Sequence, residues 1–327
     1  MSEIGRRRTV TRSRMNSIKE SLEEAATLAK GKACVYATGS FGRGEAGKFS
    51  DLDLFIVGKG PAGKSDLRRL DEICIKADLI EVTKKHGLPE FSGDGRYLIH
   101  YSVGDLVKTV GTPEDDALNT FTARLLLLLE SAPLIGSDVY HEIIDEIIIA
   151  YWRDYEDHKS SFMPAYLAND ILRLWRTFCV NYEARSDRQP VVEKAKGKIK
   201  NYKLKHSRLL TCYSAIIYLL AVFNKNHTVH PSDVKTMVSM TPTERFERLL
   251  SDSVAPNGAR PAIESLLKRY EKFLDTTNRK ESELIEMFHE KVRSSEMMKD
   301  ANEFGDSVYD VMEALKENSK FYRMIVV

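Results

Sequence analysis

Two short stretches of the sequence carry residues whose types and spacing suit chemistry on phosphates. The first is the glycine-rich segment Gly39-Ser40-Phe41-Gly42-Arg43-Gly44-Glu45, and the second is Ser50-Asp51-Leu52-Asp53, which runs into apolar residues 54–57. A glycine-rich turn can present backbone N–H groups to phosphate oxygens. Asp51 and Asp53 stand two residues apart, and alternate residues of a strand share a face, so both carboxylates are predicted to point the same way.

Paired carboxylates beside a phosphate-binding turn are what metal-assisted chemistry on a nucleoside triphosphate requires. Asp51 and Asp53 are candidate ligands of Mg²⁺ or Mn²⁺, because Mg²⁺ prefers oxygen donors and substrate phosphates. Gly39 and Ser40 are expected to hold the phosphates, and Arg43 to add a charge-assisted contact. The turn and the acids must be neighbours in space, because only residues 41–50 connect them.

A structural explanation of the same residues stays open. Glycines also serve plain turns, and Asp-x-Asp pairs also occur on solvent-facing strands. The segment is not a Walker A loop, because no Gly-Lys-Ser/Thr follows the glycines, and it is not a dinucleotide fingerprint, because a strand rather than a helix is expected after it. The combination of turn and acids between two apolar strands favours function.

The elements that must position these residues are readable from periodicity and helix caps. Helices are expected at 15–30 and 65–85, with strands at 33–38, 51–57 and 96–102. Beyond about residue 103 the patterns are helical, with a charged linker at 190–201. We therefore predict an α+β fold, in which a small mixed sheet with flanking helices is followed by an all-helical domain. The predicted parts are a mobile basic tail at 1–14, a catalytic domain at 15–140 and a helical domain at 141–327.

The bulk composition excludes some classes of protein. The chain has 327 residues, 43% hydrophobic and 30% charged, with a net charge of +1, as in a soluble globular protein without a field that forces nucleic-acid or membrane binding. Its 4 cysteines are far apart and show no zinc-ligand spacing, so reduced core cysteines are expected. No signal peptide is expected, and the apolar runs are too short to span a bilayer, which favours a cytoplasmic protein.

The segment from Gly39 to Asp53 resembles the signature of the polymerase-β-type nucleotidyltransferases, in which a Gly-Gly or Gly-Ser pair is followed by Asp-hydrophobic-Asp. Its form is most similar to that of GlnD-type uridylyltransferases and DUF294-type nucleotidyltransferases. The resemblance implies transfer of a nucleoside monophosphate from an NTP to a hydroxyl group with Mg²⁺. It also implies that Asp51 and Asp53 are metal ligands and that Gly39 and Ser40 form the nucleotide-holding turn.

The family usually carries a third carboxylate on a later strand, and the predicted strand 96–102 has no acid. Asp94, just before that strand, is the candidate third catalytic acid. Asp105, Glu81 and His100 are the alternatives, although a single strand histidine is more often structural. Without a third acid, the domain would bind a nucleotide without transferring it efficiently.

Two basic features lie in the predicted helical domain. Lys203, Lys205 and Arg208 precede an apolar helix and are candidate phosphate ligands, with a solvated linker as the alternative. Asp170, Arg173 and Arg176, with Asn169, share one helix face by i, i+3 spacing, and an ion-paired surface stripe is the simpler explanation.

The sequence thus favours a Mg²⁺-dependent nucleotidyltransferase whose acceptor is a protein, an RNA or a small molecule, with no membrane partner. The alternative is a catalytically weak nucleotide sensor or interaction module on the same scaffold. The preferred NTP and the oligomeric state are not predicted.

Overall fold

The computed structural model describes residues 2–91, 95, 98–185, 191–251, 257–316 and 319–327. The chain divides into two compact units, Met1–Arg153 and Asp154–Val327. This division falls between Arg153 and Asp154, and the domain boundary expected at residue 140 stays a prediction. The first unit contains every described strand, and the second contains helices alone among its described residues. The predicted α+β fold, a small mixed sheet with flanking helices followed by a large helical region, is confirmed.

The first unit is built on a four-stranded sheet with the order β3-β2-β1-β4. The strands are β1 (Ala33–Ala37), β2 (Leu54–Gly58), β3 (His100–Ser102) and β4 (Ala132–Ile135). β1 runs antiparallel to β2 and to β4, whereas β2 and β3 are parallel. The sequence did not predict β4, because Pro133 was interpreted as a residue that interrupts regular secondary structure. Proline is tolerated in an edge strand, and β4 is at the edge of this sheet.

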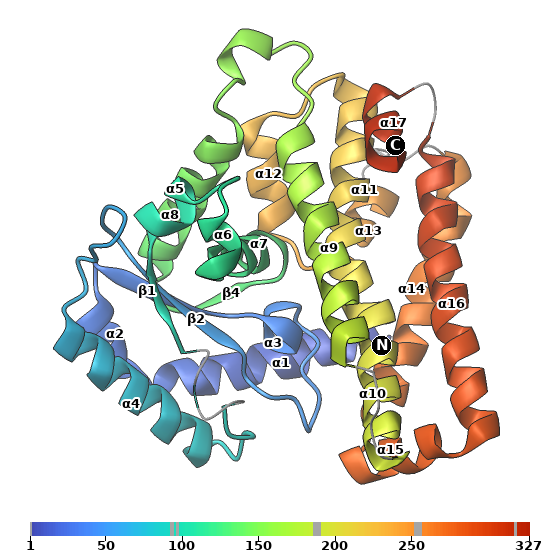
Figure 1. Ribbon diagram of the computed structural model, residues 1–327, viewed down its shortest axis with the longest axis horizontal. Helices are drawn as coiled ribbons and strands as arrows, with labels where there is room; N and C mark the ends of the chain where they lie inside the picture. Colours follow the sequence, from blue (N-terminus) through green and yellow to red (C-terminus); the bar gives the residue numbers. More distant parts are fainter. Residues whose placement is uncertain (1, 92–94, 96–97, 186–190, 252–256, 317–318) are drawn as a thin grey trace. The chain divides into compact units, whose positions relative to one another are not determined.

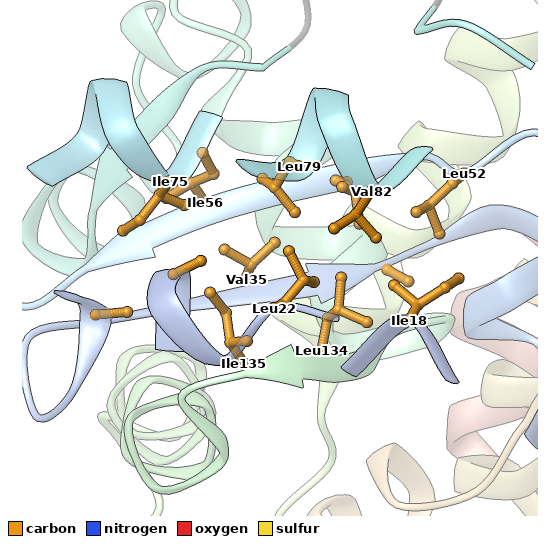
Figure 2. Close-up of a cluster of buried hydrophobic side chains, with 14 of the residues drawn as sticks. Ile18, Leu22, Val35, Leu52, Ile56, Ile75, Leu79, Val82, Leu134 and Ile135 are labelled. Atoms are coloured by element: carbon orange, nitrogen blue, oxygen red, sulfur yellow. The ribbon is translucent and has the colours of Figure 1, made fainter. Parts of the chain in front are cut away.

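Helices cover both faces of the sheet (Figure 1). One face of the sheet packs on α1 (Glu3–Glu20), α2 (Glu23–Ala29) and α4 (Arg69–Lys85). The other face packs on α5 (Val103–Lys108), α7 (Thr120–Leu129) and α8 (Ser137–Tyr151). The short helix α6 (Glu114–Ala117) packs on α7. Figure 2 shows the first core, where side chains from three sources meet: Ile18 and Leu22 of the N-terminal segment, Val35 and Ile56 of the sheet, and Ile75, Leu79 and Val82 of α4.

The other face of the sheet carries an aromatic row and a buried ion pair. Tyr36 stacks on Phe55 with ring centroids 5.5 Å apart, and Phe55 contacts Tyr101 at 6.3 Å. Arg124 of α7 and Asp115 of α6 form an ion pair at 2.6 Å in which both side chains are completely buried. Arg124 also donates to the Leu106 carbonyl oxygen at 2.9 Å, so this pair ties three helices together without leaving charge uncompensated.

The N-terminal region differs from its prediction. Residues expected as a mobile basic tail form the first part of α1, and the single helix expected at 15–30 is divided into α1 and α2. Ser2 caps α1 by accepting a hydrogen bond from Gly5 N at 3.1 Å. Ile4, Arg7 and Thr11 are buried, so this part of the helix is packed on the protein. The arginine-rich composition predicted solvent exposure. The local sequence does not reveal that this segment contacts residues 45–47, which are distant in the chain.

The expected burial of the cysteines is corrected in part. Cys74 is exposed on α4 together with Leu70 and Ile73, whereas Ile75 and Val82 of the same helix are buried. None of the 4 cysteines is in a disulfide, and only Cys34 and Cys212 are buried. Burial raises the pKa of the Cys34 thiol to about 12, so this side chain is an inert core residue.

The described part of the second unit contains helices, joined by turns and irregular segments, and no strands. Its α-helices are α9 (Ala165–Arg185), α10 (Val191–Lys203), α11 (Leu209–Asn226), α12 (Pro231–Val238), α13 (Pro242–Ser251), α14 (Arg260–Thr276), α15 (Glu281–His289), α16 (Lys291–Ala314) and α17 (Lys320–Val326). Short 3₁₀ segments are η1 (Glu156–His158) and η3 (Asn257–Ala259), and η2 (Leu204–Arg208) is a π-helical turn. The charged linker expected at 190–201 is therefore helical over its described residues, within α10.

The helical run Glu193–Asn226 is long and apolar enough, by length and composition, to cross a membrane. However, 78% of its most apolar window is buried inside the fold, as in a core helix of a soluble protein. The core beside it is aromatic: the His206 ring stacks between Phe273 and Phe304, at centroid distances of 4.5 and 4.7 Å.

Candidate functional site

The glycine-rich turn begins directly after the central strand β1. Thr38 is extended, and Gly39 has φ = +62°, in the left-handed region that favours glycine. The chain then makes the four-residue helix α3 (Gly39–Gly42), which Arg43 N closes by donating to Gly39 O at 2.9 Å. The turn therefore reverses the chain within a few residues at the end of a buried strand.

Asp53 lies against this turn. The antiparallel register of β1 and β2 continues past Ala37 and Leu54, since Thr38 N donates to the Asp53 carbonyl oxygen at 2.9 Å. A Cβ atom at Gly39 would lie 2.8 Å from Asp53 Oδ2, a distance that real Cβ atoms do not adopt. Because Gly39 has no side chain, the Asp53 carboxylate can lie in the space next to it.

Asp51 and Asp53 precede β2 instead of lying on it, because the strand begins at Leu54. Asp51 is exposed and Asp53 is half-buried, while Leu52 between them is buried in the core. Two carboxylates in this setting have the oxygen donors that a divalent cation prefers, and substrate phosphates and water would complete its coordination. Ser40 is half-buried in the turn beside them.

The amides of the turn are not all available to a ligand. Gly39 N donates to Glu130 Oε1 at 3.2 Å. Among the described residues, the chain supplies no acceptor for the amides of Ser40 and Phe41, the next two donors of the turn. These two N–H groups are the ones that a phosphate oxygen can engage.

Glu130 is a buried carboxylate beneath the turn that the sequence did not single out. Its side chain is completely buried, and its Oε2 accepts from Arg43 Nη1 at 2.8 Å. Arg43 Nε also donates to Glu45 Oε2 at 2.8 Å. Arg43, expected to contact phosphate, is only 7% exposed and is engaged by these two carboxylates. The local sequence gives no signal for Glu130, which follows an apolar helix and reaches the turn only through the tertiary fold.

Helix α1 holds the segment that follows the turn. Arg7 Nη1 donates to the Glu45 carbonyl oxygen at 3.3 Å, and Ala46 N donates to Thr11 Oγ1 at 2.8 Å. Arg14 Nη1 donates to the Gly47 carbonyl oxygen at 2.5 Å and lies over the Phe41 ring at 4.8 Å. The arginines of α1 thus stabilise the backbone of residues 45–47.

The candidates for a third acid differ in their positions and in their hydrogen-bond partners. Asp94 lies outside the described residues. Asp105 caps α5 by accepting from Ser102 N at 3.3 Å, and it also accepts from Gly63 N at 2.8 Å. His100 is hydrogen-bonded to Ser65 and Glu72, at 3.0 and 3.1 Å. Glu81 is exposed on α4. Within the described residues, no group of three or more His, Cys, Asp or Glu side chains is arranged to hold a metal ion.

The basic residues predicted to bind phosphate lie in the second unit. Lys203 is exposed at the end of α10. Lys205 Nζ donates to Asn302 Oδ1 at 2.6 Å, and the Arg208 guanidinium lies over the Phe178 ring at 5.3 Å. Lys205 and Arg208 belong to η2, a π-helical turn of the kind that often occurs at functional positions.

Comparison with known families agrees with the geometry of the first unit. Residues 18–89 match the family model described as a nucleotidyltransferase domain. The matched region includes β1, the turn, both aspartates, β2 and α4, and it supports a domain of the polymerase-β-type nucleotidyltransferase superfamily. It does not include Glu130, Asp94 or any residue of the second unit. No curated protein and no solved structure matches the chain.

Proposed function

We propose that this protein transfers a nucleoside monophosphate from an NTP to a hydroxyl group of a protein, an RNA or a small molecule, with release of pyrophosphate. The observation that carries the proposal is the contact between Gly39 and the Asp53 carboxylate, inside a region that matches a nucleotidyltransferase domain. The Asp53 carboxylate lies against the glycine-rich turn, and this proximity supports a shared site for a triphosphate and a metal ion.

In the proposed reaction, the acceptor oxygen forms a bond to the α-phosphorus while the bond from that phosphorus to the bridging oxygen of pyrophosphate breaks. The hydroxyl proton leaves to solvent, and pyrophosphate takes the electron pair of the broken bond. Asp51 and Asp53 would hold Mg²⁺ or Mn²⁺, which supplies positive charge that acidifies the hydroxyl group and stabilises pyrophosphate. The amides of Ser40 and Phe41 would hold phosphate oxygens, and the Ser40 hydroxyl would add a donor.

Arg43 and Glu130 have a positioning role in this proposal. Because Arg43 is buried between Glu45 and Glu130, its charge acts on the shape of the turn rather than on a phosphate directly. Glu130 fixes the orientation of the Gly39 amide, which in turn fixes where the Ser40 and Phe41 amides point. Lys203, Lys205 and Arg208 remain predicted phosphate ligands, and a weaker NTP affinity of the Lys203→Gln variant would support that assignment.

A second candidate function is a nucleotide sensor or interaction module with little transfer activity. The observation that favours it is the missing third ligand: in the part of the chain that the structure describes, no third His, Cys, Asp or Glu joins Asp51 and Asp53. Activation of the acceptor hydroxyl would then be weak, while binding of the triphosphate would be retained. A cytoplasmic location fits both candidates, because none of the cysteines is in a disulfide.

One experiment separates the two candidates. The full chain is incubated with each of the four α-labelled NTPs, Mg²⁺ or Mn²⁺ and cell extract, and the label is followed into protein, RNA and small molecules. Transfer by the native chain and its loss in Asp51→Asn and Asp53→Asn support the enzyme. The control is Asp66→Asn, an exposed aspartate of the same unit that should transfer normally. NTP binding without transfer to any acceptor supports the sensor, and absence of NTP binding overturns both.

A further inference from the structure

A groove of about 370 Å³ lies in the second unit between α9 and α17. Its volume is within the range of small-molecule binding sites. The polar part of its lining comes from one helix: Asn169, Arg173, Arg176, Thr177 and Asn181. These residues recur at spacings of three and four, so they share one face of α9. Asn169, Arg173 and Arg176 of the stripe noted in the sequence therefore line a concave surface.

The rest of the lining is apolar. Leu172 of α9 lines the groove and is 8% exposed, while Val180 on the same helix is 65% exposed. Met324 and Ile325 of α17, together with Val327, complete the lining. An apolar surface that faces polar and charged groups across a groove is the composition expected of a site for a small amphipathic ligand.

The charged side chains that line the groove are those of Arg173 and Arg176. Arg173 Nη1 lies 3.7 Å from Asp170 Oδ1, which compensates one of the two guanidinium groups. Arg176 is exposed, and no carboxylate of the described residues lies within ion-pair distance of it. Burial raises the pKa of the neighbouring Tyr213 hydroxyl, and the positive charge of Arg176 acts in the opposite direction. A ligand entering the groove thus meets a guanidinium that is still available for a charge-assisted hydrogen bond.

We propose that this groove binds a small ligand in which a carboxylate or phosphate group is attached to an apolar body. Arg176 would hold the oxyanion with its planar pair of donors, a geometry that matches carboxylate and phosphate. Asn169, Thr177 and Asn181 would supply neutral hydrogen bonds, and the apolar body would cover Val180 and Met324. The site goes beyond the proposed transfer reaction and does not depend on it.

A nucleic acid fits these observations less well. Binding to a phosphate backbone relies on basic side chains repeated along an extended surface. Here two guanidinium groups are confined to one concave surface with an apolar wall. The site is therefore suited to one oxyanion and one apolar group.

The test uses calorimetric titration of the full chain with four probes: phenyl phosphate, benzoate, inorganic phosphate and benzyl alcohol. We expect phenyl phosphate or benzoate to bind, inorganic phosphate to bind more weakly, and benzyl alcohol not to bind. Which of the two aromatic anions binds more tightly identifies the oxyanion. Arg176→Gln should weaken binding by about tenfold or more, and Arg176→Lys by less, because lysine keeps the charge but loses the planar donor pair.

Two controls separate this groove from the turn in the first unit. Arg279→Gln removes an exposed arginine of the same unit that does not line the groove, and it should bind the probes like the native chain. Asp51→Asn tests the proposed transfer site and should also leave probe binding unchanged. The proposal is overturned if no aromatic anion binds, if benzyl alcohol binds as well as the anions, or if Arg176→Gln binds as tightly as Arg279→Gln.

Discussion

The carboxylate of Asp53 occupies the space next to Gly39 where any other residue would carry its side chain. A Cβ atom at Gly39 would lie 2.8 Å from Asp53 Oδ2, and the preceding amide of Thr38 donates to the Asp53 carbonyl oxygen at 2.9 Å. The turn and the acid are thereby held in one arrangement by backbone and side chain together. The glycine serves two needs at this position, because its φ of +62° is also unfavourable for other residues.

Replacing Gly39 with alanine should therefore damage both stability and nucleotide binding. The left-handed backbone alone costs about 1–2 kcal/mol for a residue with a Cβ atom. The contact with Asp53 adds to this cost and displaces the proposed metal ligand. Chemical denaturation measures the stability, and titration with an NTP and Mg²⁺ measures the affinity.

Gly87→Ala is the matched control for this substitution. Gly87 has φ = +61°, and nothing lies within 4 Å of the position that its Cβ would take. Gly87→Ala should lose only the stability that a Cβ atom costs in a left-handed backbone. Its affinity for nucleotide should be unchanged. Equal nucleotide affinity in the Gly39→Ala and Gly87→Ala variants would contradict the importance of the Gly39–Asp53 contact.

Glu130→Gln should destabilise the first unit, because the amide cannot accept from both the Gly39 amide and Arg43 as the carboxylate does. Loss of one partner of a buried ion pair costs about 3 kcal/mol or more. The control is Glu142→Gln, which removes the exposed ion pair with Lys59 and should cost less than about 1 kcal/mol. Similar unfolding free energies for the two variants would show that the buried pair does not hold the turn.

Arg14→Gln should loosen the segment after the turn. The substitution removes the hydrogen bond to the Gly47 carbonyl oxygen and the contact with the Phe41 ring, together about 1–2 kcal/mol. Arg12 is exposed on the same helix, and Arg12→Gln should stay within about 0.5 kcal/mol of the native chain. Hydrogen exchange of residues 45–47 provides the local measurement. Unchanged exchange in Arg14→Gln would mean that α1 does not stabilise this segment.

His206 should make the second unit less stable in mild acid. Burial lowers the pKa of this histidine from 6.5 to about 4, against the opposing charge of Asp300 and with smaller contributions from Lys272 and Lys205. Its Nδ1 lies 2.8 Å from the Tyr202 carbonyl oxygen, and this hydrogen bond raises the pKa and so opposes part of the effect of burial. The unfolded chain takes up the proton below pH 6.5 and the folded chain only near pH 4, so the free energy of unfolding falls as the pH falls through this window.

The contribution of His206 to this pH dependence is at most about 1.4 kcal/mol per pH unit. It is isolated by comparing His206→Phe, which keeps a stacked ring, with His158→Phe, which replaces an exposed histidine of the same unit. Denaturation of both variants between pH 4 and pH 8 should give a shallower dependence for His206→Phe. An identical slope in the two variants would refute a proton-linked role of the buried ring.

Local sequence patterns predicted the elements of the first unit best where several characteristic residues stand close together in the chain. Residues 33–37 form a buried apolar strand, and the glycine segment after them forms a turn, as predicted. The similarity to a nucleotidyltransferase domain also rests on local sequence, since Gly39, Ser40, Asp51 and Asp53 lie within the matched residues 18–89. These features depend on backbone preferences and short spacings, which the sequence contains directly.

The tertiary structure alone decided which charges support the site. Glu130 meets Arg43 from a position 87 residues away in the chain, and Arg14 meets Gly47 from a position 33 residues away. In the sequence, Arg14 belongs to an arginine-rich stretch expected to be mobile, and Glu130 ends an apolar helix. A buried charge is tolerated only where the fold brings its partner, and that partner is chosen by packing between elements that are distant in the sequence.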